Sequence, residues 1–182
     1  MILPIYLYGS EVLRQKAAPA DLAEKEKITK LVSDMEETLA KSEGCGLAAP
    51  QVGESVRILI VDGTGMTDVY PYLAGFKRVM INPVVLEESE KKCEYSEGCL
   101  SIPGIYCDVT RPQSITVEYY NGDFEKVTET LDKFACRMVQ HEMSHLDGDL
   151  FVDHVASIRK KIISKKLMNI AKGKVFARYA TK

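Results

Sequence analysis

The sequence contains no apolar run long enough to cross a bilayer, which takes about 20 residues, so we expect no membrane partner. Its first residues, Met1–Pro4, lack a basic start and meet a proline at once, so we expect no secretory signal. Repeats, linkers and low-complexity segments are absent. With 182 residues, 46% of them hydrophobic, the chain can bury one good core, which predicts a single domain over residues 1–182.

Acidic residues are missing from the last part of the chain. From Val155 to Lys182 there are nine Lys or Arg and no acidic residue, which leaves −11 for the rest of a chain whose net charge is −2. Such a basic end could meet an anionic surface such as nucleic acid. The solvated face of a terminal helix explains it equally well.

The number of cysteines is odd. The five are Cys45, Cys93, Cys99, Cys107 and Cys136. With no secretory signal expected, a reduced cytosol fits best. A cysteine with a role in this chain is therefore expected to be a metal ligand or a nucleophile before it is half of a disulfide.

Helical periodicity recurs along the chain. Apolar spacing predicts helices over Leu22–Lys41, Asp132–Leu146 and Ser157–Lys172, the last of them basic. Ser10 can cap a further short helix over Glu11–Lys16.

Short strands are predicted between these helices. They cover Val56–Val61, Val79–Leu86, Ile115–Tyr119 and Phe124–Leu131, with Asn121-Gly122 as a hairpin signal between the last two. Together the elements predict an α+β fold, in which small mixed or antiparallel sheets pack around the helix over Asp132–Leu146.

That helix carries the strongest chemical signal, His141-Glu142-Met143-Ser144-His145. Two histidines four residues apart lie on one face of a helix, so both imidazoles can reach one metal ion. Glu142 lies close enough to hydrogen-bond a metal-bound water without being a ligand. The alternative is a helix with two surface histidines, but the chain has only three histidines, and a metal site is favoured.

A His-Glu-x-x-His site needs a third protein ligand. The metzincin arrangement places a histidine six residues after His145, where this chain has Phe151, and the thermolysin-like arrangement needs a downstream glutamate, which is absent. Upstream, Cys99 is the best candidate, because a thiolate is a strong ligand and its glycine neighbour lets a metal come close. Two imidazoles and one thiolate would leave a fourth position open, as in catalytic sites. Weaker downstream candidates are Asp149, Asp153 and His154.

A glycine- and alanine-rich stretch, Gly44-Cys45-Gly46-Leu47-Ala48-Ala49-Pro50-Gln51, allows its backbone to approach another group closely. No Lys-Ser/Thr follows, so it is not a phosphate loop. Two interpretations remain open: a tight helix-to-strand turn, or the edge of a cleft with Gln51 as an amide donor.

Three stretches together resemble a known family. They are Gly44–Gln51, Glu97-Gly98-Cys99-Leu100-Ser101 and Gln140–His145, and they are similar, in order, to the three signature motifs of peptide deformylases of the bacterial type. The resemblance covers essentially the whole chain. It implies hydrolysis of the N-formyl group from the formyl-methionine that begins newly synthesised polypeptides.

The resemblance also implies roles for individual residues. Cys99, His141 and His145 would hold the metal, and Glu142 would move the proton from water to the leaving amine. The Gln51 side-chain amide and the Leu100 backbone N–H would meet the oxyanion. Each such donor is typically worth about 2.7–4 kcal/mol of barrier.

A pocket for the substrate methionine is implied as well. The resemblance places Tyr95, Phe134, Met138 and Cys45 there. Phe134 and Met138 lie one helical turn apart, which supports their pairing independently. Backbone contacts to the peptide are implied for Gly46, Gly98 and Gly104.

One position departs from the family. Ser144 stands where an aspartate is usual, beside residues that correspond to Arg111 and Glu97. A serine can accept a hydrogen bond but cannot neutralise Arg111, so we expect Glu97 to carry that pairing alone. Changes of this kind around a metal can cost about 10–100-fold in affinity or activity.

Cofactor and partners follow from the same resemblance. It implies Fe²⁺ in the cell, with Zn, Ni or Co as replacements, although the ligand types alone suit Zn²⁺ as readily as Fe²⁺. It also implies a monomer in the bacterial cytoplasm, with the basic helix over residues 157–172 docking on the ribosome near the exit tunnel. Two alternatives remain: a zincin-type metallo-endopeptidase, and a catalytically impaired metal-binding protein associated with RNA or the ribosome.

Overall fold

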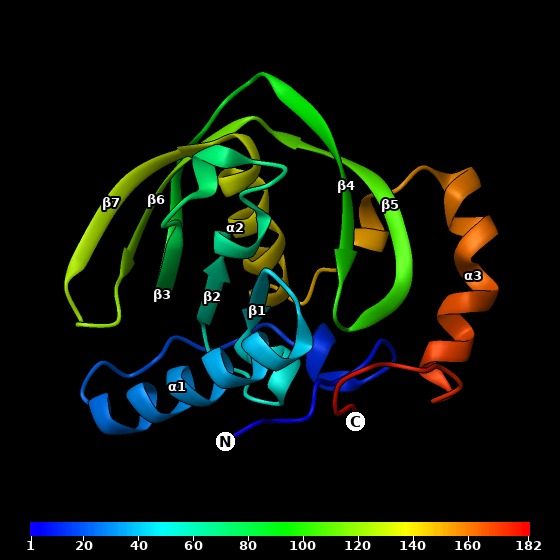
Figure 1. Ribbon diagram of the computed structural model, residues 1–182, viewed down its shortest axis with the longest axis horizontal. Helices are drawn as coiled ribbons and strands as arrows, with labels where there is room; N and C mark the ends of the chain where they lie inside the picture. The colour runs from blue at the N-terminus through cyan, green and yellow to red at the C-terminus, as the bar shows by residue number, and fades with distance from the viewer.

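The computed structural model describes residues 1–182 and has the expected α+β architecture (Figure 1). Its helices are α1 (Lys25–Ser42), α2 (Lys133–Leu146) and α3 (Ser157–Ala171). Both sheets are antiparallel. Shorter 3-10 turns cover Glu11–Arg14, Ala49–Val52, Thr64–Met66, Pro71–Leu73 and Phe151–His154.

The larger sheet has five strands in the order β1-β2-β3-β6-β7. They are β1 (Gly46–Ala48), β2 (Ile58–Asp62), β3 (Lys77–Glu88), β6 (Ser114–Tyr120) and β7 (Lys126–Asp132). The second sheet is a long hairpin of β4 (Lys92–Cys99) and β5 (Ile102–Pro112). In Figure 1, α2 lies between the two sheets.

Helix α2 is held there by its apolar face. Met138 and Val139 are buried in a cluster that also contains Leu59, Val61 and Val117 of the large sheet. On its other side, Arg137 donates a hydrogen bond to the backbone oxygen of Val109 in β5, at 2.8 Å. Helix α2 is therefore fixed from both sides, and its histidines cannot shift without moving the core.

Two predicted helices have different bounds in the structure. Helix α1 begins at Lys25 rather than Leu22, because Asp21 forms a turn in which its side chain and backbone oxygen accept hydrogen bonds from Ala23 and Glu24. The short helix after Ser10 is a 3-10 turn that ends at Arg14, and the Ser10 side chain does not cap it.

The β6–β7 hairpin was predicted at the right place, with one strand beginning later. The Asn121 side chain accepts hydrogen bonds from the backbone N–H groups of Asp123 and Glu125, both at 3.0 Å. This loop places Phe124 in a left-handed conformation with φ 62°, outside the strand in which it was predicted. Strand β7 therefore starts at Lys126.

The β4–β5 hairpin was not predicted as a pair of strands. In β5, Ile105, Cys107 and Val109 are buried at every second position, which is the strand period. Their buried partners come from Phe151 and from Ile163 of α3, far away in the sequence. Pairing of Cys99 with Ile102 leaves Leu100 and Ser101 as the turn.

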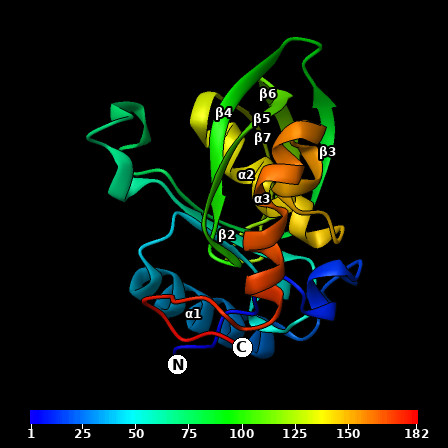
Figure 2. The ribbon, with the colours of Figure 1, turned by 90° about the vertical axis from the view of Figure 1, so that its right-hand side faces the viewer.

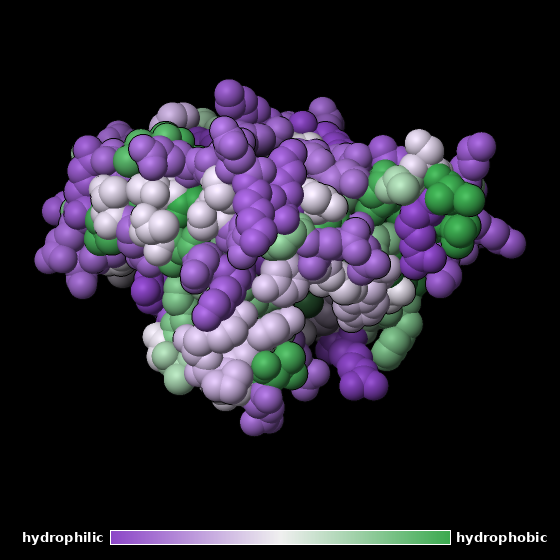
Figure 3. All heavy atoms as spheres, turned by 90° about the horizontal axis from the view of Figure 1, so that it is seen from above, coloured by the Kyte–Doolittle hydropathy of each residue, from purple (hydrophilic) through white to green (hydrophobic).

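The chain ends beside its own beginning. Helix α3 packs against β5 through Ile163 and Ile170, and the residues after it turn back so that Ile5 and Thr181 form a parallel bridge (Figures 1 and 2). None of the helices has both the length and the apolar character needed to span a membrane. Figure 3 shows one mainly hydrophilic face, with hydrophobic side chains in small groups.

Candidate metal centre and its cleft

Three side chains of types that can bind a metal converge between the sheets. The donor atoms of Cys99, His141 and His145 all lie within 4.8 Å of one another, and Cys99 Sγ is 3.3 Å from His145 Nε2. The histidines lie one turn apart on α2, and Cys99 is the last residue of β4. One thiolate and two imidazoles at this spacing fit a single divalent transition-metal ion.

The downstream ligand candidates are engaged elsewhere. Asp153 forms an ion pair with Arg14 at 2.6 Å, and His154 pairs with Asp149 on the surface. Neither pair belongs to the converging group. Of the ligand candidates given by the sequence, only Cys99 lies with the histidines.

Glu97 orients one of these histidines. Its carboxylate accepts from His141 Nδ1 at 2.7 Å and from Arg111 at 2.8 and 3.0 Å. This leaves the other nitrogen of His141 for a metal. Burial alone would raise the pKa of Glu97, but the hydrogen bonds from His141 and Arg111 outweigh it and hold that pKa well below its usual range.

Arg137 joins this network and was not identified from the sequence. Its guanidinium is buried and donates to Glu97 at 2.6 Å. A signal existed, because Arg137 lies four residues before His141, beside the predicted inner-face residue Met138 of the same helix. A charged residue at such a position indicates a buried partner.

Ser144 lies beside Arg111, as the family resemblance implied. Its hydroxyl accepts from Arg111 Nη1 at 3.0 Å and donates to the Gln140 backbone oxygen at 3.1 Å. Two buried guanidinium groups, Arg111 and Arg137, therefore share the single carboxylate of Glu97.

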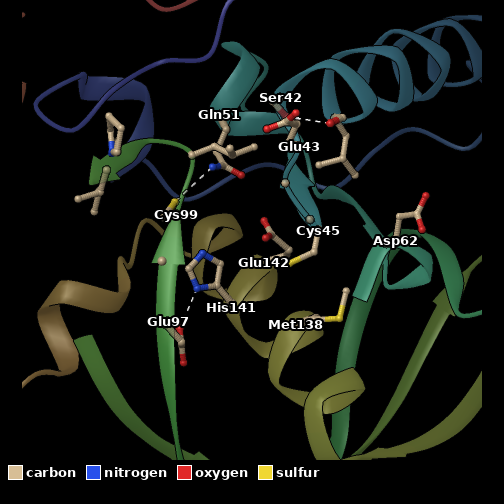
Figure 4. Close-up of a pocket in the computed structure, with 18 of the residues that line it drawn as sticks. Ser42, Glu43, Cys45, Gln51, Asp62, Glu97, Cys99, Met138, His141 and Glu142 are labelled. Carbon is tan, nitrogen blue, oxygen red and sulfur yellow. Dashed lines mark hydrogen bonds and ion pairs between the residues drawn. The ribbon is translucent and has the colours of Figure 1, made fainter. Parts of the chain in front are cut away.

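Glu142 lies at the centre of the cleft, between Cys45 and His141 (Figure 4). It is 5% exposed, and its Oε2 has no hydrogen-bond partner in the protein. Burial raises the pKa of Glu142 to about 7. A buried carboxyl with a free oxygen and a pKa near neutrality can both accept and release a proton.

Gly46 provides the space for this carboxylate. A Cβ at position 46 would lie 2.5 Å from Glu142 Oε1. The glycine-rich stretch of the sequence is thus both a short strand, β1, and the edge of the cleft.

Gln51 is buried at the end of that stretch. Its Oε1 accepts from the Ala48 N–H at 2.9 Å, so its Nε2 points the other way and donates to Cys99 Sγ at 3.4 Å and Ser101 Oγ at 3.1 Å (Figure 4). The amide is held in one orientation by Ala48, as a fixed donor in a water-poor site requires.

The cleft around these residues has a volume of about 1020 Å³. Most of the side chains and glycines predicted for substrate contacts line it: Cys45, Gly46, Gly98, Gly104, Phe134 and Met138. Leu100, predicted to meet the oxyanion, lines it as well. Tyr95 does not line it, but its ring packs edge-on against Phe134, with centroids 5.5 Å apart. The cleft also has a wall that sequence analysis missed, Phe176–Tyr179.

Comparison with known proteins gives consistent matches. The family model for polypeptide deformylase matches residues 2–161. A peptide deformylase of Christiangramia forsetii is 41% identical over 186 residues, covering 98% of this chain and 94% of that protein. The crystal structure of a peptide deformylase from Legionella pneumophila has a TM-score of 0.83 at 30% identity, covering 96% of this chain and 98% of that one. The crystal structure of an actinonin-bound class I type b peptide deformylase from Acinetobacter baumannii has a TM-score of 0.76 at 34% identity, covering 86% of this chain and 99% of that one.

Proposed function

The chain belongs to the peptide deformylase family, and from this membership we propose how its own residues remove the N-formyl group from nascent polypeptides. The observation that supports the assignment of roles is the convergence of Cys99, His141 and His145 beside the buried, unpartnered carboxylate of Glu142. A site with three ligands and an adjacent proton acceptor suits hydrolysis of an amide.

The family is metal-dependent, and Cys99, His141 and His145 would hold the ion. A divalent ion bound there would supply a Lewis acid that polarises a carbonyl and lowers the pKa of water to about 7. We propose Fe²⁺ as the metal in the cell, with Zn, Ni or Co as replacements; metal analysis after anaerobic purification tests this identity.

Glu142 carries the proton. It accepts one from the attacking water as the water oxygen bonds to the formyl carbon. It then gives that proton to the amine nitrogen as the C–N bond breaks, so the products are formate and a free N-terminus. A carboxyl group with a pKa near 7 serves both steps.

Two donors of the chain meet the charge that develops on the formyl oxygen. They are the side-chain amide of Gln51 and the backbone N–H of Leu100, each expected to contribute about 2.7–4 kcal/mol. The methionine side chain enters the pocket of Cys45, Phe134 and Met138, with Tyr95 packed edge-on against Phe134.

The test is formate release from formyl-Met-Ala-Ser by anaerobically purified, metal-replete protein. Release of formate with the peptide otherwise intact supports the proposal. Cleavage within the peptide chain without formate would favour the endopeptidase alternative, and no reaction at all would favour the impaired, RNA-associated one.

Gly46→Ala is expected to lower formate release about 10²-fold, because the added Cβ would occupy space 2.5 Å from Glu142 Oε1 and displace the carboxylate. Metal content should not change. Gly65→Ala is the matched control, since a Cβ there meets nothing within 4 Å. Full activity of the Gly46 variant would show that Glu142 tolerates displacement.

Ser144→Asp is expected to slow loss of the metal to a chelator about tenfold. The new carboxylate would lie beside Arg111. In the wild type, Glu97 is the single carboxylate that pairs with both Arg111 and Arg137. Ser144→Asn is the uncharged control of similar size. Equal chelator rates for the Asp and Asn variants would contradict a charge effect.

We also propose that the whole chain works as one cytoplasmic, monomeric unit whose basic helix, α3, docks on the ribosome. The support is charge: α3 contains Lys160, Lys161, Lys165 and Lys166, all exposed, and no acidic residue. The test is co-sedimentation with ribosomes, which should weaken as the salt concentration rises. No co-sedimentation, or co-sedimentation that is independent of salt, would contradict this docking.

A further inference from the structure

The C-terminal tail, defined here as Lys174–Lys182, is anchored to the beginning of the chain. The Ile5 N–H donates to the Ala180 oxygen at 2.9 Å, and the Lys182 N–H donates to the Ile5 oxygen at 2.9 Å. The Leu7 N–H donates to the Lys182 oxygen at 3.1 Å. These three backbone bonds hold the end of the tail beside the beginning of the chain (Figure 2), and none of them involves the Tyr179 side chain.

This tail lies outside the part of the chain that matches the family model, which ends at residue 161. Nevertheless it reaches the cleft, where Phe176–Tyr179 form one wall. The tail is thus a part of the cleft that lies outside the residues matched by the family model.

Within the cleft, the Tyr179 side chain of the tail contacts the Leu100–Ser101 turn. Three long-range hydrogen bonds hold this turn, each from a different part of the chain. The Tyr8 N–H donates to the Ser101 oxygen at 2.8 Å, and Gln51 Nε2 donates to Ser101 Oγ at 3.1 Å. The third comes from the tail, where the Tyr179 hydroxyl donates to the Leu100 oxygen at 2.6 Å.

The third bond differs from the other two in what it fixes. Tyr8 and Gln51 both hold Ser101, whereas Tyr179 alone among them holds Leu100. Because each peptide unit is planar, fixing the Leu100 carbonyl fixes the peptide that joins Leu100 to Ser101. The Leu100 N–H belongs to the preceding peptide, which begins at Cys99, the last residue of β4 and paired with Ile102. With a restrained peptide on each side of the Leu100 Cα, the direction of the Leu100 N–H is limited.

We propose that Tyr179 is a positioning residue for the deformylation reaction, whose hydroxyl holds the Leu100–Ser101 turn so that the Leu100 N–H points at the developing oxyanion. This rests on the proposed role of Leu100. Tyr179 does not touch the reacting atoms and acts through the turn. Its effect belongs to the transition state, in which the oxyanion exists, rather than to binding of the substrate.

The test compares Tyr179→Phe with wild-type protein, both metal-replete, using formyl-Met-Ala-Ser. We expect kcat per bound metal to fall about three- to tenfold, the size expected for loss of one ordinary hydrogen bond, with KM unchanged within twofold. Metal content and Tm should match those of Tyr120→Phe. Tyr120 is the matched control because it is also half-buried, its hydroxyl has no hydrogen bond, and it lies outside the cleft.

Each other outcome overturns the proposal in a distinguishable way. Unchanged kcat in an active protein removes the role of Tyr179 and leaves the proposed function intact. A lower Tm or metal content with unchanged kcat per metal would make Tyr179 structural only. A rise in KM alone would make the tail a binding surface. If the wild type releases no formate, the proposed function fails as well.

A second measurement separates positioning from substrate recognition. If Tyr179 acts through Leu100, the loss of kcat should be the same for formyl-Met-Ala and for longer formylated peptides. A loss of kcat that grows with peptide length would show that the tail contacts the residues after methionine, and would contradict action through the turn.

Discussion

Replacing Glu142 with glutamine will lower formate release by about 10²–10⁴-fold, the usual contribution of a general acid–base group. The amide has nearly the same shape but can neither accept the proton of the attacking water nor return it to the amine. Because Glu142 is not among the converging metal donors, the variant should bind as much metal as the wild type. The measurement is formate release per bound metal.

The control for this variant is Glu43→Gln, which alters another carboxylate on the lining of the same cleft. It should retain the activity of the wild type. The loss in Glu142→Gln could then not be due to the removal of a negative charge from the cleft in general. Activity of Glu142→Gln within a few-fold of wild type would remove Glu142 from the mechanism. In that case another group of the cleft would have to carry the proton.

Replacing Cys99 with alanine will remove both metal and activity. The thiolate is one of only three converging donors, and the site has no spare ligand, since Asp153 is paired with Arg14 and His154 with Asp149. Two imidazoles alone do not make the usual three-ligand catalytic site. We expect less than a tenth of the wild-type metal content after dialysis, together with loss of formate release of about 10²-fold or more.

Cys93→Ser is the matched control, because Cys93 is also half-buried and lies on the same strand, β4, but is not among the converging donors. It should keep its metal and its activity. Metal retention by the Cys99 variant would contradict the proposed ligand set. It would return the downstream residues, and with them the endopeptidase alternative, to consideration.

The sequence alone determined those parts of the site that depend on local geometry. The pairing of His141 with His145 follows from the helical repeat, and Glu142 is placed by the same repeat. The order of the three short motifs indicated the family, and with it Cys99, Gln51 and Leu100. The family assignment is confirmed by the comparisons, whereas the roles of these residues stay predictions until the variants are measured.

Strand pairing was less accessible from the sequence. β4 and β5 were missed because β4 is mostly polar and because the residues that cover β5 come from distant parts of the chain, Leu7 and residues from 150 onwards. The bounds of α1 and β7 differed where a polar side chain, Asp21 or Asn121, satisfied backbone groups in a turn. Such side-chain bonds compete with helices and strands and leave little trace in apolar periodicity.

Only the tertiary structure decided which distant residues meet. Arg137 reaches Glu97, 40 positions away, Tyr95 packs edge-on against Phe134, and Tyr179 reaches Leu100, 79 positions away. No sequence period relates such pairs, since their contact depends on how the sheets and the chain ends pack against α2. The sequence therefore determined which residue types can bind a metal and how they are spaced, and the packing of the whole chain decided how these side chains are oriented.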